Sequence, residues 1–561
     1  MQATGHNHSA TSQLAVVVAF VLAGLGPAQA QPAPDRPSIA ASALRLPPHA
    51  PSYLAATYQA AMRAPLPIAA SPVGGDVPAS LPQTGSFPDE GGMLGIFQPG
   101  GATTTAGNAF FQSLGTNGRA CVTCHQPTHG MSVSAASIQN RFVQTGGRDP
   151  IFAPVDGANC PSAVAGSITS ASLVGRLLGK GRADFVGSHS LLLTRGLFRV
   201  FLPVPANAEY TVELVSDPSG CNADPDYNHV TNADGTVSRL LSVYRRPLMA
   251  ANLKFVTVTG ADTGVLPAID PVDGSPLTPE PDHPGYFESG NILWDGREPT
   301  LASQATDATL GHAQALDAPT TAQVSQILAF ENGIYTAQSM RAGAGWLDAR
   351  GGQGGPVTLA GTAPGQALSS TLSNDQPMSL YSAFDTTGST LRASIVRGEQ
   401  LFDTRSFTVA NVAGINNALG VPASIRLTCG GCHTQVGSGS STFPKGQLNI
   451  GTAGDAVLFG GPAPDPALPI FRLTCTGTAS TPFEGRVVLT NDPGRALISG
   501  KCIDIGLKTV PQLNALAARA PYFSNGLAPT LADVVAFYDK RFSIGLSASE
   551  KHDLANFLSA L

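Results

Sequence analysis

Two short segments of this chain carry the same pattern, C-x-x-C-H, about three hundred residues apart. In this pattern both thiols can add to the vinyl groups of a haem and form thioethers, and the adjacent imidazole can coordinate the iron from one side. The residues that would hold two such groups are Cys121, Cys124 and His125 in the first copy and Cys429, Cys432 and His433 in the second. The sequence therefore predicts two covalently bound haem c groups, with His125 and His433 as iron ligands.

Two other kinds of site use closely spaced cysteines. A structural zinc site would require a second C-x-x-C or a cluster of histidines near each motif. A thioredoxin-like redox pair would require a βαβ setting. Neither pattern is present, so covalent haem attachment is the favoured interpretation.

The ligand on the opposite side of each iron decides between electron transfer and chemistry with peroxide or oxygen. The last of the seven methionines is Met378, so none follows the second motif. His552 is the only histidine beyond that motif, and it lies on the polar side of the last predicted helix. The ligand candidates that remain downstream include Tyr522 and Tyr538.

The composition narrows the class of protein. The 561 residues carry a net charge of −6 with an isoelectric point near 6.0, and no basic stripe indicates a nucleic-acid partner. Charged residues make up only 12% of the chain, and there are 62 glycines and 45 prolines. Such a loop-rich chain, poor in charge, suits wrapping around a large apolar group.

The N-terminus is typical of a secretory signal peptide. Residues 14–25 form an apolar run that is too short to span a bilayer, and residues 28–30 read Ala-Gln-Ala, a cleavage site. The segment before the run has no lysine or arginine. We expect cleavage near Ala30, export to the periplasm, and no integral membrane segment afterwards.

Four cysteines lie outside the two motifs. In an oxidising compartment they are expected to form disulfides. Sequence order favours Cys160 with Cys221 and Cys475 with Cys502, although the other pairings and free thiols stay open.

The elements that would position the motifs are expected to be mainly helices. Helical spacing precedes each motif, at 108–115 and 394–402, and recurs at 300–314 and 320–335, where Thr320 or Thr321 could cap the helix. At the C-terminus Ser547 and Glu550 form a capping box, and the last helix has an apolar face. The face consists of Leu554, Phe557, Leu558 and Leu561.

The fold class expected from these patterns is mainly α, with two cytochrome-c-like haem domains, long loops and a small β-containing insertion in the N-terminal half. Strand-like alternation appears only in the segment 150–290, which includes "EYTVELV" and "LKFVTVTG". The expected division is a signal peptide at 1–30, a Pro/Ala-rich arm at 31–95, an N-terminal domain at 96–390 and a C-terminal domain at 391–561.

Longer motifs around the two haem segments carry a family resemblance. They are "NILWDGREPTLASQA" at 291–305, "RGEQLF" at 397–402 and "LKTVPQLNALAARAPYFSNGLAPTLADVVAFYD" at 507–539. With these motifs in this order around the two haem segments, the chain resembles the bacterial dihaem cytochrome c peroxidases and the related MauG-type enzymes over about half its length.

The resemblance implies a role for each haem. The N-terminal haem would be the active one, and the C-terminal haem would relay electrons, with Tyr538 as its sixth ligand. Trp294 would conduct electrons between the two, while Asp295 and Arg297 are expected to stabilise its loop by an ion pair. The resemblance also implies a calcium ion held partly by backbone carbonyls of Arg519 and Pro521.

Two positions depart from the family pattern. The glutamate that assists O–O cleavage in the peroxidases is replaced by Gln314, which cannot carry a proton as a carboxylate does. His312 lies close by and could substitute. No histidine stands at the distal position after the first motif, and His129 and Met131 lie too near the attachment site, so an open N-terminal haem is expected.

The predicted function is therefore reduction of hydrogen peroxide, or oxidation of a protein partner, at the N-terminal haem. Electrons would come from a small cytochrome c or a cupredoxin. Two alternatives stay open: a rubber-oxygenase-like dihaem oxygenase, and a non-enzymatic dihaem electron carrier.

Overall fold

The protein is described here from a computed structural model. It describes residues 78–164, 185–232, 234–260, 278–279, 286–364, 377–417, 422–434, 438–439, 446–454, 462–477, 479 and 484–561. The predicted signal peptide and the predicted arm up to residue 77 lie outside these ranges. Within them, no helix is both long and apolar enough to cross a membrane.

The prediction of a mainly α fold is wrong. Of the described residues, 30% lie in helices and 21% in strands, which makes the fold mixed α/β. All named strand pairs are antiparallel. Most strands are short, and several find their partners far away in the chain, so local periodicity does not reveal them.

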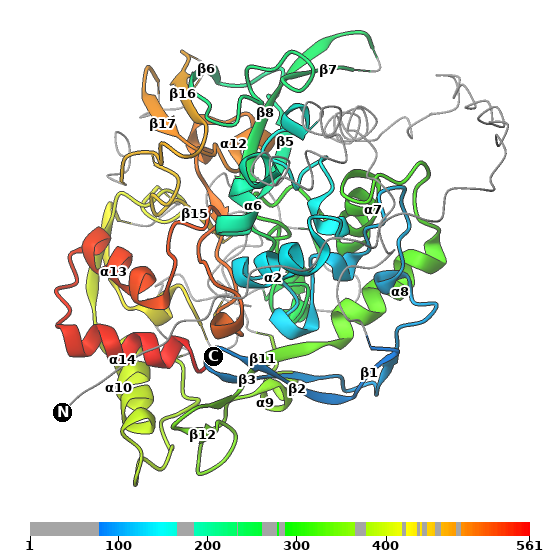
Figure 1. The fold of residues 1–561 in the computed structure, drawn as a ribbon. Helices are drawn as coiled ribbons and strands as arrows, with labels where there is room; N and C mark the ends of the chain where they lie inside the picture. The colour runs from blue at the N-terminus through cyan, green and yellow to red at the C-terminus, as the bar shows by residue number, and fades with distance from the viewer. Residues whose placement is uncertain are drawn as a thin grey trace, which may run out of the picture. The chain divides into compact units, whose positions relative to one another are not determined.

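A four-stranded sheet shows this most clearly (Figure 1). Strands β2 (Thr84–Asp89) and β3 (Gly92–Phe97) form a hairpin within the segment that was expected to be an arm. Strand β11 (Tyr335–Arg341) then pairs with β3, placing Tyr335 opposite Phe97. The short strand β12 (Gly345–Trp346) completes the sheet beside β11.

The predicted insertion supplies two further sheets. In one, β8 (Val237–Arg245) lies between β5 (Phe198–Pro203) and β7 (His229–Thr231). In the other, β6 (Tyr210–Ser216) pairs with β16 (Ile470–Cys475), which also pairs with β17 (Val487–Thr490). Strands from the two predicted domains therefore share one sheet.

Two disulfides lie in this part of the molecule. The structure joins Cys160 to Cys221 and Cys475 to Cys502, the pairing that sequence order favours. Cys475 and Cys502 belong to the same apolar core as Phe471 of β16, so this bond links a strand to the loop that packs on it.

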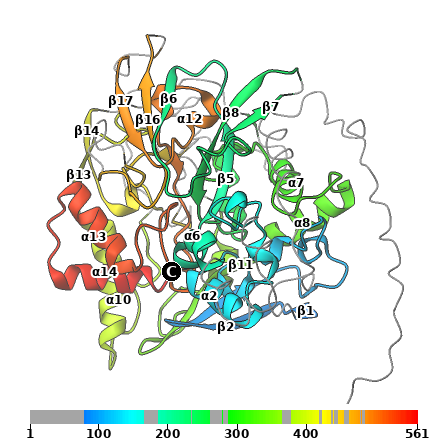
Figure 2. The same ribbon diagram turned by 45° about the horizontal axis from the view of Figure 1, so that its top comes forward.

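Three helices surround the second motif. Helix α10 (Thr390–Thr404) packs against α14 (Ala548–Leu558), and α13 (Leu531–Phe542) packs against α14 as well. Figure 2 shows the three together. The capping box of Ser547 and Glu550 is confirmed, and so is the buried face of the C-terminal segment.

Two helices lie near the first motif. Helix α7 (Leu301–Gly311) is capped by Thr300. Helix α8 (Thr321–Gly333) is capped by Thr320, one of the two threonines expected there. The helix expected at 108–115 is only the single 3-10 turn η1 (Ala109–Phe111), whose phenylalanines pack against a phenylalanine of α8.

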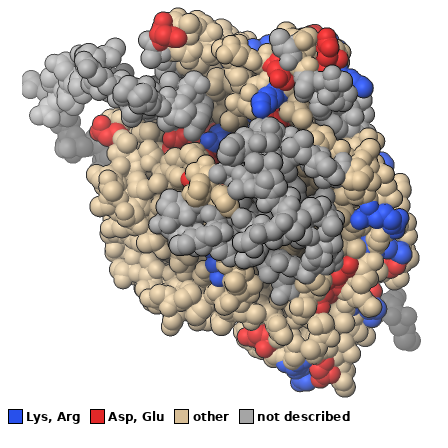
Figure 3. All heavy atoms as spheres, turned by 180° about the vertical axis from the view of Figure 1, so that it is seen from behind, with Lys and Arg blue, Asp and Glu red and all other residues tan. Residues whose placement is uncertain are grey.

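The remaining elements are short. The other helices are α2 (Ala135–Thr145), α6 (Ser190–Arg195), α9 (Pro356–Gly361), α12 (Ala496–Ser499) and the 3-10 turns η3 (Pro127–His129), η4 (Pro150–Phe152), η5 (Leu253–Phe255), η7 (Cys502–Asp504) and η8 (Leu516–Ala518). The two-stranded ladders are β1 (Ser80–Leu81) with β4 (Thr103–Thr104), β9 (Val258–Gly260) with β10 (Tyr286–Glu288), β13 (Phe407–Ala410) with β14 (Ser424–Leu427), and β15 (Gln447–Leu448) with β18 (Lys508–Thr509). Charged side chains are sparse and scattered over the described surface that Figure 3 shows.

Candidate haem-binding sites

The two C-x-x-C-H motifs have the same backbone conformation. Each begins with a single 3-10 turn, η2 (Cys121–Thr123) and η6 (Cys429–Gly431). The second cysteine has φ −109° and ψ −25° in the first copy, and φ −108° and ψ −26° in the second. The peptide N–H of each histidine donates to the carbonyl of the first cysteine at 3.0 Å. The two motifs therefore adopt the same local structure.

Both motif histidines present one ring nitrogen for coordination. Nδ1 of His125 donates to the carbonyl of Met131 at 3.1 Å, and Nδ1 of His433 donates to the carbonyl of Gly439 at 2.5 Å. Burial lowers the pKa of both imidazoles, which favours the neutral form. A neutral ring with its proton held on Nδ1 directs the lone pair of Nε2 outward, as in histidines that bind metals.

Each motif faces a cavity of its own. The first cavity has a volume of about 210 Å³ and includes Cys121, Cys124 and His125 in its wall. The second has a volume of about 200 Å³ and includes Cys429, Cys432 and His433. None of the four thiols is in a disulfide, and burial raises the pKa of each. Paired free thiols and a coordinating imidazole on a largely apolar wall fit a covalently attached haem.

One layer of residues separates the two cavities, and we call it the shared wall. Trp294 belongs to it, and the indole N–H donates to the carbonyl of Arg246 at 2.7 Å. The carbonyl of Trp294 accepts from the N–H of Thr509 at 2.9 Å. The structure thus places Trp294 between the two cavities. The residues that line both cavities are Arg246, Pro247, Trp294, 509–512 and Arg519.

Buried charges support the loop that carries Trp294. The predicted ion pair of Asp295 with Arg297 is confirmed at 2.9 Å. Asp295 is fully buried and also pairs with Arg245, which in turn pairs with Asp492 at 2.8 Å. Sequence reasoning missed Arg245 and Asp492, which come from the end of β8 and from the segment after β17.

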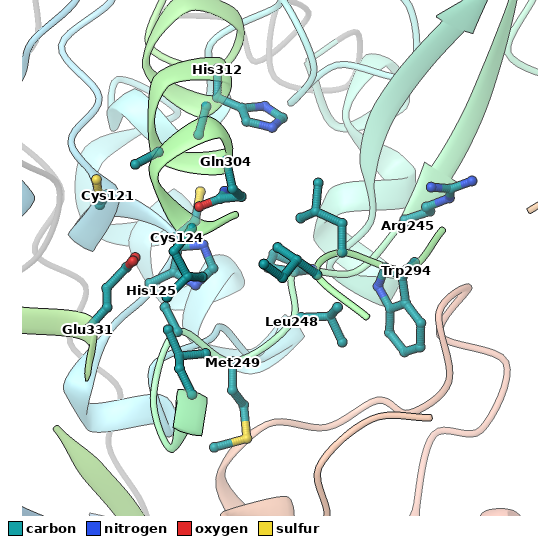
Figure 4. A pocket seen from close by; sticks show the side chains of 18 of the residues that line it. Cys121, Cys124, His125, Arg245, Leu248, Met249, Trp294, Gln304, His312 and Glu331 are labelled. Carbon is teal, nitrogen blue, oxygen red and sulfur yellow. The ribbon is translucent and has the colours of Figure 1, made fainter. Parts of the chain in front are cut away.

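Three polar side chains of the first cavity come from α7, its C-terminal end and α8. Figure 4 shows Gln304, His312 and Glu331 around it, with the two cysteines at one end and Arg245 and Trp294 at the other. Glu331 is only 5% exposed, and its Oε2 has no hydrogen-bond partner. Burial raises the pKa of this carboxyl from 4.5 to about 8, so it holds its proton near neutral pH.

The raised pKa of Glu331 predicts a stability that depends on pH. Its contribution to stability is complete below about pH 4.5 and is lost as the pH rises through about 8. The Glu331→Gln variant cannot ionise, so we expect it to match the wild type in free energy of unfolding at low pH. At pH 8 it should exceed the wild type by on the order of 2 kcal/mol, measured by urea unfolding at both pH values.

The exposed Glu90, which does not line the first cavity, provides the control for this comparison as the Glu90→Gln variant. A gap between Glu331→Gln and the wild type that stays constant from acid to neutral pH would contradict the assignment.

His312 and Gln314 have different surroundings. His312 lines the first cavity, and its Nδ1 bonds to Asp156, whose carboxylate also pairs with Arg119. Burial alone would raise the pKa of Asp156, but Arg119 and His312 outweigh it and lower the pKa. Gln314 is buried with φ of 55° and accepts a hydrogen bond from Asn117 at 3.1 Å. It is not among the residues that line the cavity.

Tyr538 is the phenol placed to face His433. Both side chains line the second cavity, with ring centroids 6.5 Å apart and ring planes at 78°. The hydroxyl of Tyr538 has no hydrogen-bond partner in the described part of the chain, and burial raises its pKa. Tyr522 lines the same cavity, but its hydroxyl already donates to the carbonyl of Leu516 at 2.8 Å.

The other predicted positions are less suited to ligands. The carbonyl of Arg519 accepts from Nη2 of Arg246 at 2.9 Å, so a calcium ion there would compete with a guanidinium group. Pro521 lines the second cavity. Met249 lines the first cavity, but its sulfur points away from His125 in Figure 4 and the side chain packs in a small apolar cluster. Within the described ranges, no group of three or more His, Cys, Asp or Glu side chains could hold a metal ion.

Among the cavity residues that the sequence analysis did not predict, Glu331 could have been found from the spacing of residues along its helix. It stands four residues after Ile327, so both lie on one face of α8, and that face lines the first cavity. A single carboxylate on an otherwise apolar helical face marks a site candidate. No local sequence pattern indicates Asp156, because its contacts in the cavity are with residues far away in the chain.

The chain was also compared with known proteins. No family model matches it. No curated protein matches it either. The function therefore has to be inferred from the two motifs and the cavities that they face.

Proposed function

We propose that this chain is an exported dihaem c-type oxidoreductase that reduces hydrogen peroxide in the first cavity, with electrons entering through the second. Each peroxide takes up two electrons and two protons and yields two water molecules. The electrons would come from a cytochrome c, a cupredoxin or a side chain of a protein partner. The observation that carries the proposal is the repeated motif, with one cavity for each copy and Trp294 in the wall between them.

A bound haem would supply an iron that binds peroxide and exchanges electrons. The chain supplies the attachment, because each pair of thiols stands beside a neutral imidazole at the edge of an apolar cavity. Trp294 spans the shared wall and is held by hydrogen bonds at its ring and its backbone.

The two cavities differ in their polar groups, and this difference supports a different function for each. Glu331 can hold a proton in the first cavity, and Asp156 orients the imidazole of His312 beside it. The second cavity offers Tyr538 opposite His433 within an apolar lining. The first cavity is therefore suited to proton-coupled chemistry, and the second to passing electrons.

The alternative of an oxygenase was left open because Gln314 replaces the glutamate that assists O–O cleavage in the peroxidases. Glu331 brings a carboxyl group to the same cavity from another helix, which favours peroxide as the oxidant. The electron-carrier alternative would leave Glu331 and the pair of His312 with Asp156 without a role.

The decisive experiment is to measure haem content and EPR spectra of the purified protein, before and after stoichiometric peroxide. We expect two haem groups per chain, one high-spin and one low-spin, and a rapid change on adding peroxide. Two low-spin EPR signals that do not change on adding peroxide would indicate an electron carrier. A stable oxygen adduct would indicate an oxygenase. A colourless product would overturn the proposal altogether.

The Tyr538→Phe variant tests the ligand of the second site. It removes only the hydroxyl, so we expect unchanged haem content but a low-spin EPR signal that is replaced by a high-spin one. Tyr522→Phe is the matched control, because its hydroxyl already donates to Leu516, and its spectrum should equal that of the wild type. An unaltered low-spin signal in Tyr538→Phe would remove this residue as a ligand.

A further inference from the structure

Two arginines of the shared wall lack an anionic partner. Arg246 is 5% exposed, and the accessible part of Arg519 lines both cavities. Neither forms an ion pair in the described structure. Three other buried arginines do have carboxylate partners: Arg119 pairs with Asp156, Arg141 with Asp149, and Arg245 with Asp295 and Asp492. The buried Arg199 forms no ion pair in the described structure, but it does not line either cavity and bonds to Ser242 and the carbonyl of Val155.

Arg246 bonds only to backbone carbonyls. Its Nη1 donates to Arg195 at 2.7 Å, and its Nη2 donates to Val133 at 2.6 Å and to Arg519 at 2.9 Å. A guanidinium has five N–H groups, so Arg246 retains donors that these carbonyls do not use.

Arg519 uses even fewer of its N–H groups in hydrogen bonds. Its Nε donates to the carbonyl of Asn514 at 3.1 Å, and its Nη2 donates to the carbonyl of Gln512. Its Nη1 makes no hydrogen bond within the described residues. The unused N–H groups of a residue that lines both cavities are available to a ligand in either one.

The two unpaired charges are costly without an anion. Nη2 of Arg246 reaches the carbonyl of Arg519 at 2.9 Å, so the two cationic residues are in direct contact. A buried cation beside a half-buried one is unfavourable unless a negative group neutralises them.

A haem carries two carboxylates, and these are the negative groups that the shared wall lacks. Its two carboxylates lie on the edge of the ring away from the vinyl edge that the cysteines bind. In the first cavity, Figure 4 places the cysteines at one end and Trp294 and Arg245 at the other. A ring attached at the cysteine end therefore directs its carboxylates toward the shared wall.

We propose that Arg246 and Arg519 bind the carboxylate groups of both haems, as one cationic site used from two sides. This inference rests on the proposed function, because it requires both haems to be present. The two arginines would then set the reduction potentials of both irons together. Arg297 lines only the first cavity, and Lys508 only the second, so neither can act on both in this way.

The test is the reduction potential of each haem in Arg246→Gln and Arg519→Gln, measured by spectroelectrochemical titration. Loss of a nearby positive charge stabilises the oxidised iron, so both potentials should fall. We expect at least a tenfold change in each reduction equilibrium constant, about 59 mV for one electron. Arg472→Gln, at an exposed position, should leave both potentials unchanged.

The Arg519→Lys variant covers the case in which a glutamine variant fails to fold. It keeps the charge but loses the fork of donors, so we expect shifted carboxylate bending bands of both haems in resonance Raman spectra. A protein that holds two haems but shows unmoved potentials and bands, or a change in only one haem, would overturn this inference and leave the proposed function intact. A wild-type protein without haem would instead remove the proposed function.

Discussion

Replacing both Cys121 and Cys124 by serine is expected to halve the haem content and to abolish peroxide reduction. Serine cannot form a thioether, so the first cavity loses its covalent group while the second keeps its own. Haem per chain can be measured by the absorbance of the pyridine complex and by the mass of the intact protein. Turnover can be followed by the loss of peroxide in the presence of a reduced donor.

The matched variant replaces Cys429 and Cys432 by serine. It should also contain one haem per chain, but it should still react once with peroxide, because the first cavity with Glu331 is intact. It should fail to turn over, since electrons no longer enter through the second cavity. If the variant without Cys121 and Cys124 keeps two haems or full turnover, the assignment of the first cavity is wrong.

The Trp294→Phe variant is expected to slow turnover by about 100-fold, equal to about 2.7 kcal/mol in the activation barrier. Phenylalanine fills part of the same space but is much harder to oxidise, and it loses the N–H that bonds to Arg246. Haem content and spin states should stay as in the wild type. Stopped-flow mixing of the reduced protein with peroxide would separate electron transfer from the binding of peroxide.

Trp346 provides the control, because it is the other tryptophan of the chain and is 53% exposed at the edge of a sheet. Trp346→Phe should turn over at the rate of the wild type. Equal rates for the wild type and Trp294→Phe would show that electrons cross the shared wall by another route.

The sequence by itself determined the parts of this protein that depend on neighbouring residues. The spacing of each C-x-x-C-H motif specifies one tight turn, and both copies fold into it. The caps at Thr320 and Ser547 mark helix starts correctly, because a cap is a contact between residues three positions apart. The absence of methionine after the second motif leaves Tyr522 and Tyr538 as candidate ligands, and the family resemblance favours Tyr538, whose ring centroid lies 6.5 Å from that of His433.

Only the tertiary structure decided how distant segments meet. Strand β6 pairs with β16, so a predicted insertion became part of a sheet that joins the two predicted domains. Gln314 was expected at the first cavity, but its left-handed backbone turns its side chain toward Asn117, and Glu331 from the next helix lies at the cavity instead. Side-chain direction depends on backbone angles and on partners far away in the chain, and no local pattern records either of them.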